Sequence, residues 1–292
     1  FIHDFETGDA EIFKGGTNDI LLAGSVALNS DADIFAFSMR EGGYYGNGTV
    51  AVYQFDSNYT ASPKGPIIRE VLDGGLRTNF GKTFDLSKDG ETIAIAAPMA
   101  EYNSGILGRY QVYYYRDSRW EKKGQLLTDF LTRGDYGAGK SVALSGDGNT
   151  IAVSASEFYE LHTAMGMARV YRYNQMVNEW YQLGTDFLGE KLSEFGTFLS
   201  LSFDGNVVAI GSGITGLHQM NNYAQVHEWV NDEIWVQRGG DFKPHTKSDS
   251  RDVRLSDDGR ILAIGGFMSD PSIQDNRTTF VQVFEWTGVP YS

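Results

Sequence analysis

A repeat of about 58 residues is the feature that most constrains what this chain can fold into. Five segments resemble one another, and each carries a leucine at the same place. The shared leucines are Leu28, Leu86, Leu144, Leu201 and Leu255. They are separated by 58, 58, 57 and 54 residues. A period of this length is typical of proteins in which copies of one supersecondary unit pack on each other, so we interpret the 292 residues as five copies of one unit.

Each copy has the pattern of four short strands. The first strand carries the shared leucine and ends at a Ser-x-Asp-Gly turn, as at Asp89-Gly90 and Asp147-Gly148. Asp-Gly between apolar runs predicts a tight hairpin in which both central residues have positive φ. The second strand is a run of small and β-branched residues, the third is rich in aromatic residues, and the fourth follows a polar turn. In the first copy we assign the fourth strand to residues 66–72, PIIREVL.

Four-stranded units repeated in this way predict an all-β protein, a five-bladed β-propeller of four-stranded antiparallel blades. A β-sandwich does not repeat at this period, whereas a larger ring stays open as an alternative if the chain is a fragment. We treat residues 1–292 as one propeller domain. The first strands of the five blades are predicted near residues 24–30, 82–88, 140–146, 197–203 and 251–257.

The two ends of the chain suggest how the ring closes. The fifth copy stops after its third strand, and residues 11–16 (EIFKGG) resemble the fourth strand at 235–240 (WVQRGG). We therefore predict that an N-terminal strand completes the last blade, which would remove an unpaired sheet edge. The chain begins at Phe1 without Met, so we expect a processed form or a fragment of a larger chain or assembly.

Composition excludes several classes of function. The formal net charge is −14, which is unfavourable for a protein that must displace counterions from nucleic acid, so no nucleic-acid partner is expected. Cysteine is absent, which excludes disulfides, thiol catalysis and zinc–thiolate sites. No apolar run reaches the roughly 18 residues of a membrane span, so no membrane insertion is expected.

Residues 80–98 and 195–213 resemble the FG-GAP repeat of integrin α-subunit propellers, and as a repeat pattern the resemblance covers nearly the whole chain. It implies a secreted, extracellular or cell-surface protein, a glycoprotein with a role in recognition or cell adhesion. Several FG-GAP repeats hold calcium in an Asp-x-Asp-x-Asp-Gly loop. Here that place is a Ser-x-Asp-Gly turn with too few oxygen ligands for calcium, so neither a metal nor another cofactor is expected.

Two short motifs match functional patterns by accident. Residues 134–141 match the Walker A pattern, but a strand in the repeat register follows instead of the helix that phosphate binding requires. Arg133-Gly134-Asp135 is the tripeptide that many integrins bind, and one such match arises by chance in a Gly- and Asp-rich chain. Three sequons in predicted loops are candidates for glycosylation, at Asn47, Asn58 and Asn276.

The connections between second and third strands and between blades are long, and they share one rim of a propeller. Because long loops on a rigid scaffold carry most binding sites, we predict that this rim binds the ligand. The aromatic and amide side chains suited to a sugar or a protein surface are Tyr44, Tyr45, Tyr102, Asn103, Tyr159, His162 and His218. His162 and His218 fall at equivalent positions, and we interpret them as loop residues and not as a metal pair.

The innermost strands give no catalytic set. Some five-bladed propellers are glycosidases, which need two carboxylates near the axis. The residue before the shared leucine is Ala27, Asp85, Ala143, Ser200 and Arg254 in turn. With one acid in that column, we predict no catalytic residue, and we interpret Asp85 and Arg254 as a charge pair.

These observations favour a non-enzymatic extracellular recognition module that holds a protein or a carbohydrate on its long-loop rim. A carbohydrate-active enzyme and a structural subunit of a larger extracellular assembly remain the alternatives.

Overall fold

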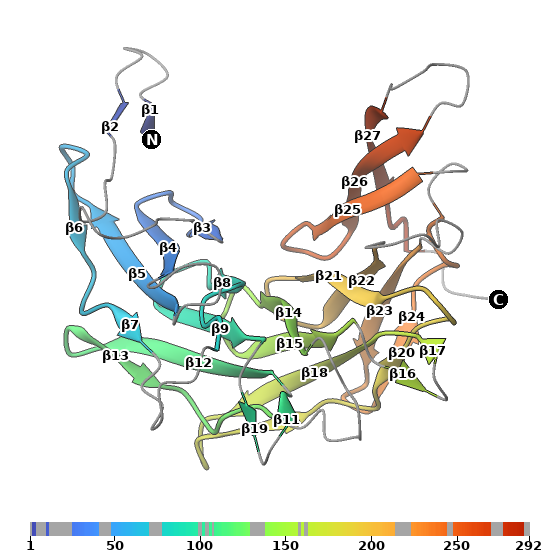
Figure 1. Ribbon diagram of the computed structural model, residues 1–292, viewed down its shortest axis with the longest axis horizontal. Helices are drawn as coiled ribbons and strands as arrows, with labels where there is room; N and C mark the ends of the chain where they lie inside the picture. The colour runs from blue at the N-terminus through green and yellow to red at the C-terminus, as the bar shows by residue number, and fades with distance from the viewer. Residues whose placement is uncertain are drawn as a thin grey trace.

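In the computed structural model, sheets follow one another around a common centre, from the N-terminal blue sheet at the left of Figure 1 to the C-terminal red sheet at the upper right. The fold is that of a five-bladed β-propeller, as predicted. The structure describes residues 2–3, 10–11, 25–40, 48–69, 78–98, 101–102, 105–106, 108–128, 138–156, 159–160, 163–213, 223–243, 248–269 and 277–288.

Each of five antiparallel sheets forms one blade. Blade one contains β3 (Val26–Leu28), β4 (Ile34–Arg40), β5 (Gly48–Phe55) and β6 (Ala61–Pro63), with β7 (Ile68–Arg69) also on β5. Blade two contains β8 (Phe84–Leu86), β9 (Thr92–Ala97), β12 (Arg109–Arg116) and β13 (Arg119–Lys122). Blade three contains β14 (Ala138–Leu144), β15 (Thr150–Ala155), β18 (Met167–Asn174) and β19 (Glu179–Gln182), with β20 (Phe187–Leu188) on β18. Blade four contains β21 (Phe195–Leu201), β22 (Val207–Ser212), β23 (Ala224–Val230) and β24 (Ile234–Gln237), and blade five β25 (Ser248–Leu255), β26 (Ile261–Ser269) and β27 (Arg277–Glu285).

The Ser-x-Asp-Gly turns are held by side chains as well as by glycine. In blade two, Ser87 Oγ accepts a hydrogen bond from the Thr92 amide (2.9 Å), and Asp89 Oδ1 accepts one from the Glu91 amide (2.9 Å). Gly90 is left-handed (φ 72°), whereas Asp89 is not, so the expectation of two positive-φ residues was wrong. The serine and aspartate side chains stabilise the turn together with glycine, because their oxygens accept hydrogen bonds from amides of the turn.

Blade one reaches the same turn with different residues. Asn29 replaces the serine, and its Oδ1 accepts from the Ile34 amide (2.9 Å). Ala32 takes the place of the glycine and is itself left-handed (φ 56°). The turn geometry is thus kept in this copy although its sequence signal is lost.

Adjacent blades pack face to face through four apolar clusters, one at each of the four junctions. The shared leucine of each of blades two to five packs against the preceding blade, as Leu144 does in the cluster between blades two and three. The outer halves of three junctions are joined by a tryptophan whose Nε1 donates to a carbonyl of the preceding blade. These bonds are Trp120 to Lys64 (2.8 Å), Trp180 to Lys123 (2.7 Å) and Trp235 to Leu183 (2.9 Å).

The fourth strand of blade one is not where the sequence predicted it. β6 occupies that place, and only Ile68–Arg69 of the predicted PIIREVL strand pairs, at the other end of β5. In blades two, three and four the chain after the fourth strand likewise pairs with the start of the third strand. The pairing residues are Leu127, β20 and Phe242. The apolar run is therefore a repeated loop anchor, and the prediction mistook it for the strand.

The predicted closure of the ring is not made by Glu11. This residue belongs to β2 (Ala10–Glu11), which pairs with β1 (Ile2–His3) in a local hairpin. Residues 12–16 lie outside the described part of the chain, and in that part blade five has three strands. The local partner lies only a few residues away in sequence, so pairing with it closes a much shorter loop than pairing with blade five. Over the residues described, no helix is long and apolar enough to cross a membrane.

Candidate functional site: the long-loop rim

The predicted ligand residues lie mostly outside the described parts of the rim. Tyr44, Tyr45, Asn103, His162 and His218 are not described. Tyr102 and Tyr159 are described through their backbones, in two small hairpins: β10 (Glu101–Tyr102) with β11 (Gly105–Ile106), and β16 (Tyr159–Glu160) with β17 (Thr163–Ala164). Both hairpins extend the connection between the second and third strands of their blade. The rim is thus structured at blades two and three, while the roles predicted for these side chains stay predictions.

One connection of this rim is described throughout, and we call residues 187–194 the blade 3–4 loop. It starts at β20, which pairs with the first residues of β18. The loop then folds back over the start of that strand. The Gly189 amide donates to Gly166 O (3.0 Å), and Ser193 Oγ donates to Met165 O (2.9 Å).

The far side of the loop is fixed to blade four. Tyr223 Oη accepts from the Glu190 amide (2.9 Å), and Thr197 Oγ1 donates to Glu194 O (2.6 Å). Phe195, the first residue of β21, is completely buried, and its ring stacks on Tyr223 at 5.3 Å. The loop is therefore bound to the sheets at both ends and along its length.

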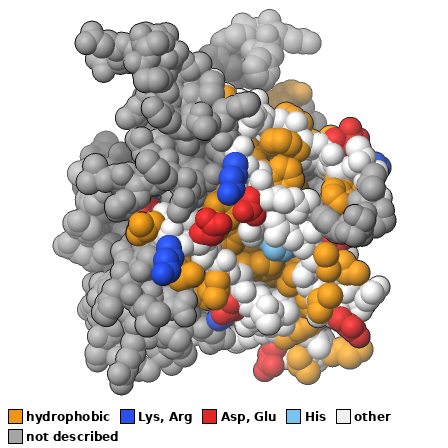
Figure 2. Space-filling model, turned by 90° about the vertical axis from the view of Figure 1, so that its right-hand side faces the viewer, with side chains coloured by type: hydrophobic (Ala, Val, Ile, Leu, Met, Phe, Trp, Pro, Cys, Tyr) orange, Lys and Arg blue, Asp and Glu red, His pale blue; other side chains and the backbone are white. Residues whose placement is uncertain are grey.

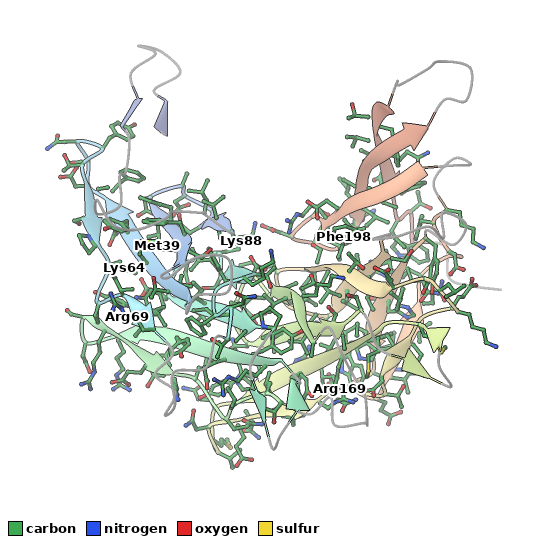
Figure 3. All side chains as sticks on the ribbon, viewed as in Figure 1. Met39, Lys64, Arg69, Lys88, Arg169 and Phe198 are labelled. Atoms are coloured by element: carbon green, nitrogen blue, oxygen red, sulfur yellow. The ribbon has the colours of Figure 1, made fainter. Side chains whose placement is uncertain are left out.

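An ion pair holds the segment that leads into the loop. Arg169 of β18 donates hydrogen bonds to both carboxylate oxygens of Asp186. The Nε–Oδ1 and Nη2–Oδ2 distances are each 2.6 Å. Burial by itself lowers the pKa of Arg169, but the hydrogen bonds that Arg169 donates to Asp186 and Tyr171 raise this pKa above its usual range. Figure 3 labels Arg169 on blade three at the lower right. A planar two-point contact of this kind fixes direction as well as distance.

The tip of this fixed loop presents apolar side chains to solvent. Leu188 is 52% exposed and Leu192 is 42% exposed, with Glu190 and Lys191 also exposed between them. Leu192 and Glu194 both have left-handed backbones, with φ of 63° and 48°. Such conformations cost energy for residues other than glycine and persist where the surroundings impose them, often at binding sites.

Charged side chains border the loop. Lys140 at the start of blade three lies 4.0 Å from Glu194 (Nζ–Oε2). The rim at this junction therefore combines exposed leucines with charges of both signs on a rigid frame.

The axis of the propeller holds acids that are already engaged. Asp85 accepts hydrogen bonds from the amides of Leu144 (2.8 Å) and Leu86 (3.0 Å), and burial raises its pKa while those amides lower it. Its Oδ2 joins blade two to blade three, as Ser200 Oγ joins blade four to the Leu255 amide (3.0 Å). Asp85 is a link between blades.

The other axial charges pair with each other. Arg254 Nε contacts Asp252 (3.1 Å), so its direct partner is this acid of its own strand, while at longer range it lowers the pKa of Asp85. Lys88 Nζ contacts Asp257 (3.0 Å), across from blade two to blade five, and Figure 3 labels it near the centre of the ring. Each of these carboxylates has a structural partner, which leaves none of them placed as an uncommitted acid or base of the kind glycoside hydrolysis needs.

The short sequence motifs gain no functional geometry in the described residues. The second half of the Walker A match lies in strand β14, in place of the helix that nucleotide binding needs. Asn58 is exposed in the turn at residues 56–60, whereas Asn47, Asn276 and Arg133-Gly134-Asp135 lie outside the described residues. Within the part of the chain that the structure describes, no three acidic or histidine side chains are grouped as a metal site would require.

Comparison with known proteins supports the fold. The hydrazine synthase of Kuenenia stuttgartiensis superimposes with a TM-score of 0.55 at 12% identity, over 94% of this chain and 66% of that one. The periplasmic gluconolactonase PpgL of Pseudomonas aeruginosa superimposes with a TM-score of 0.56 at 16% identity, over 96% of this chain and 77% of that one. The chain is a β-propeller. It spans just under two thirds of the hydrazine synthase chain, and at these identities the likeness shows the fold alone.

No protein-family model and no curated protein matches the sequence. The resemblance to FG-GAP repeats, and the adhesion role and extracellular location that it implies, therefore stay predictions. The blade 3–4 loop was not predicted as a site from the sequence, because a leucine is the residue type expected in the core. Only the left-handed backbone of the loop and the exposure of its leucines distinguish it.

Proposed function

We propose that this propeller is a non-enzymatic recognition module, and that it binds a partner protein through the blade 3–4 loop. The observation that carries the proposal is the pair of exposed leucines held on a loop that is hydrogen-bonded to both neighbouring blades. A rigid apolar anchor loses little conformational entropy on binding, which favours affinity. The FG-GAP resemblance supports an extracellular or cell-surface location as part of the same proposal.

A partner protein fits this surface better than a glycan. Sugars are held by aromatic faces and by rows of hydrogen-bonding groups, whereas the loop offers two aliphatic side chains beside Glu190 and Lys191. The engaged axial carboxylates also favour binding without catalysis.

The test is a selection of binders from a phage-displayed peptide library on the wild-type protein. Leu192→Asp and Leu188→Asp should each weaken the selected peptides at least about tenfold, because a buried charge replaces an apolar anchor. The matched control is Met176→Asp, since Met176 is exposed on the opposite rim.

Peptides that bind both loop variants as well as wild type would contradict the site. Hydrolysis of glycosides from a broad chromogenic panel would contradict the non-enzymatic assignment.

A further inference from the structure

The outer edge of the third strand is covered in the first four blades. A valine carbonyl of that strand accepts a hydrogen bond from the amide of a later segment of the same blade. These bonds are Lys64 to Val52 (2.8 Å), Lys123 to Val112 (2.9 Å), Leu183 to Val170 (2.8 Å) and Arg238 to Val226 (2.7 Å). The outward backbone groups of these strands therefore have partners within their own blade.

In blade five the corresponding edge belongs to β27. Val283 is the equivalent valine, because it pairs with Ala263 as Val226 pairs with Ala209. Among the described residues β27 is the outermost strand of its sheet. The Trp286 amide donates to Arg260 O, toward β26, so the odd-numbered residues of β27 direct their backbone groups away from β26, to the side where the described residues place no further strand.

Within the described residues, this edge has charged residues only at its two ends, Arg277 and Glu285, and lacks the other usual protection. β27 is nine residues long (RTTFVQVFE), with no proline, glycine or lysine. Val281 is 72% exposed and Val283 is 65% exposed. Figure 2 shows hydrophobic side chains in several surface patches on the side of the molecule to which blade five belongs. A long, apolar and unpaired edge strand is a template for pairing with another chain.

We propose that β27 pairs antiparallel with β27 of a second copy of this chain, about a two-fold axis through Val281. In this register Thr279 lies opposite Val283 of the second copy, and Arg277 lies opposite Glu285 of the second copy. This register places residues of opposite charge across from each other at both ends of the paired strands, and a shift by two residues in either direction would remove that match. Two-fold pairing of identical edges gives a closed dimer and joins the two sheets into one.

The same alternation decides which groups form the contact. Val281, Thr279 and Val283 supply the outward amides and carbonyls, and each facing pair of this kind exchanges two hydrogen bonds. The contact is small, because it uses one strand from each copy, so we expect a dissociation constant on the order of micromolar.

The first experiment measures mass against concentration by size-exclusion chromatography with light scattering. The wild type should shift with increasing concentration toward twice its 32.3 kDa chain mass. Glu285→Arg should stay monomeric, since it faces Arg277 of the second copy, and the double swap Arg277→Glu with Glu285→Arg should restore the dimer. Glu233→Arg, the same charge change on an exposed turn of blade four, is the control and should dimerise like wild type.

The second experiment uses the absence of cysteine. Val281→Cys places the two sulfurs opposite each other at the axis, where the Cα atoms of a hydrogen-bonded pair lie about 5.5 Å apart, within disulfide reach. Mild oxidation should give a disulfide-linked dimer, whereas Val177→Cys, 60% exposed on blade three, should not.

Three outcomes would overturn the proposal. One is a wild type that stays monomeric to about 100 µM, some hundredfold above the expected constant. Another is a dimer that Glu285→Arg leaves intact. The third is slow hydrogen exchange at Val281 and Val283 in the monomer, because it would mean that a strand of the same chain already covers the edge.

Discussion

The same repeat residues are buried between blades and exposed at the two ends of the blade series. The shared leucine is 5% exposed in blade three (Leu144) and 59% exposed in blade one (Leu28). The equivalent valine of the third strand is 4% exposed in blade four (Val226) and 65% exposed in blade five (Val283). The repeat therefore encodes both halves of a junction in every copy, and burial depends on whether a neighbouring blade is present.

The four internal junctions also contain polar links that complement the apolar clusters. Besides the tryptophan bonds, the turns at the axis form a chain of backbone hydrogen bonds from one blade to the next, as from Lys88 N to Gly146 O (2.9 Å) and from Phe203 N to Asp257 O (2.8 Å). In the described residues this chain runs from Ser30 in blade one to Asp257 in blade five. Apolar packing and directional bonds together fix the orientation of the internal blades.

The largest effect is expected at Tyr110, which is completely buried between blades two and three. Its hydroxyl accepts from the Gly139 amide (2.6 Å) and bonds to the backbone of Ser154. Tyr110→Ala should cost about 4 kcal/mol of unfolding free energy, because it leaves a cavity and unsatisfied amides. Tyr59→Ala, at an exposed turn of blade one, is the control and should change the urea midpoint little. Equal losses at both positions would remove the distinction between junction and surface.

A second effect depends on pH. Burial lowers the pKa of His227 to about 4, and its ring packs on Phe187 of blade three at 4.7 Å. The unfolded chain then binds the proton more readily than the folded protein, so stability is lost as pH falls from about 6.5 to about 4, by up to about 3 kcal/mol.

His227→Phe, which carries the ring that blade five has at the equivalent position (Phe284), should flatten this part of the pH dependence. Thermal unfolding between pH 4 and pH 7 measures it. A wild-type stability that does not change over this range would refute the assignment.

A smaller effect is expected at Trp180, which joins blades two and three at their outer edge. Trp180→Phe keeps most of the apolar contact but loses the bond to Lys123 O, at a cost of about 1–2 kcal/mol. Its neighbour Tyr181 is exposed, so Tyr181→Phe should cost less than about 0.5 kcal/mol. Chemical denaturation of the two variants compares a bonded with a solvent-facing ring on one strand.

The smallest effect is expected at the end face of blade five. Val283→Thr should change the stability of the monomer by less than about 0.5 kcal/mol, because its hydroxyl stays in water. Val226→Thr, in the same column of blade four, should cost about 1–2 kcal/mol for burying an unsatisfied hydroxyl. If the two substitutions cost the same, a further blade or strand must cover Val283 in solution.

The sequence predicted the architecture because the repeat is strict where packing demands it. The shared leucine, the small residues of the second strand and the Ser-x-Asp-Gly turn each occupy a position with one physical role. The fourth strand of blade one was misplaced because Ala61–Pro63 carries no apolar signal, whereas the neighbouring apolar run does. Local propensity could not distinguish a strand from a loop anchor there.

The blade 3–4 loop could not be predicted as a site from the sequence, for a different reason. Leu188 and Leu192 have the residue type of a core, and only their surroundings in space show that they face solvent. The inward link of Asp85 to the Leu144 amide was equally invisible, since it joins residues 59 apart. Roles that depend on contacts between blades need the structure.

A leucine-to-alanine series at the five equivalent positions tests the central claim most directly. Equilibrium unfolding should show losses of about 3 kcal/mol at the three buried leucines, Leu86, Leu144 and Leu201. The loss should be smaller at the half-buried Leu255, and under about 0.5 kcal/mol at Leu28. A loss at Leu28 as large as that at Leu144 would contradict the account, because it would show that blade one packs on a neighbour at both faces.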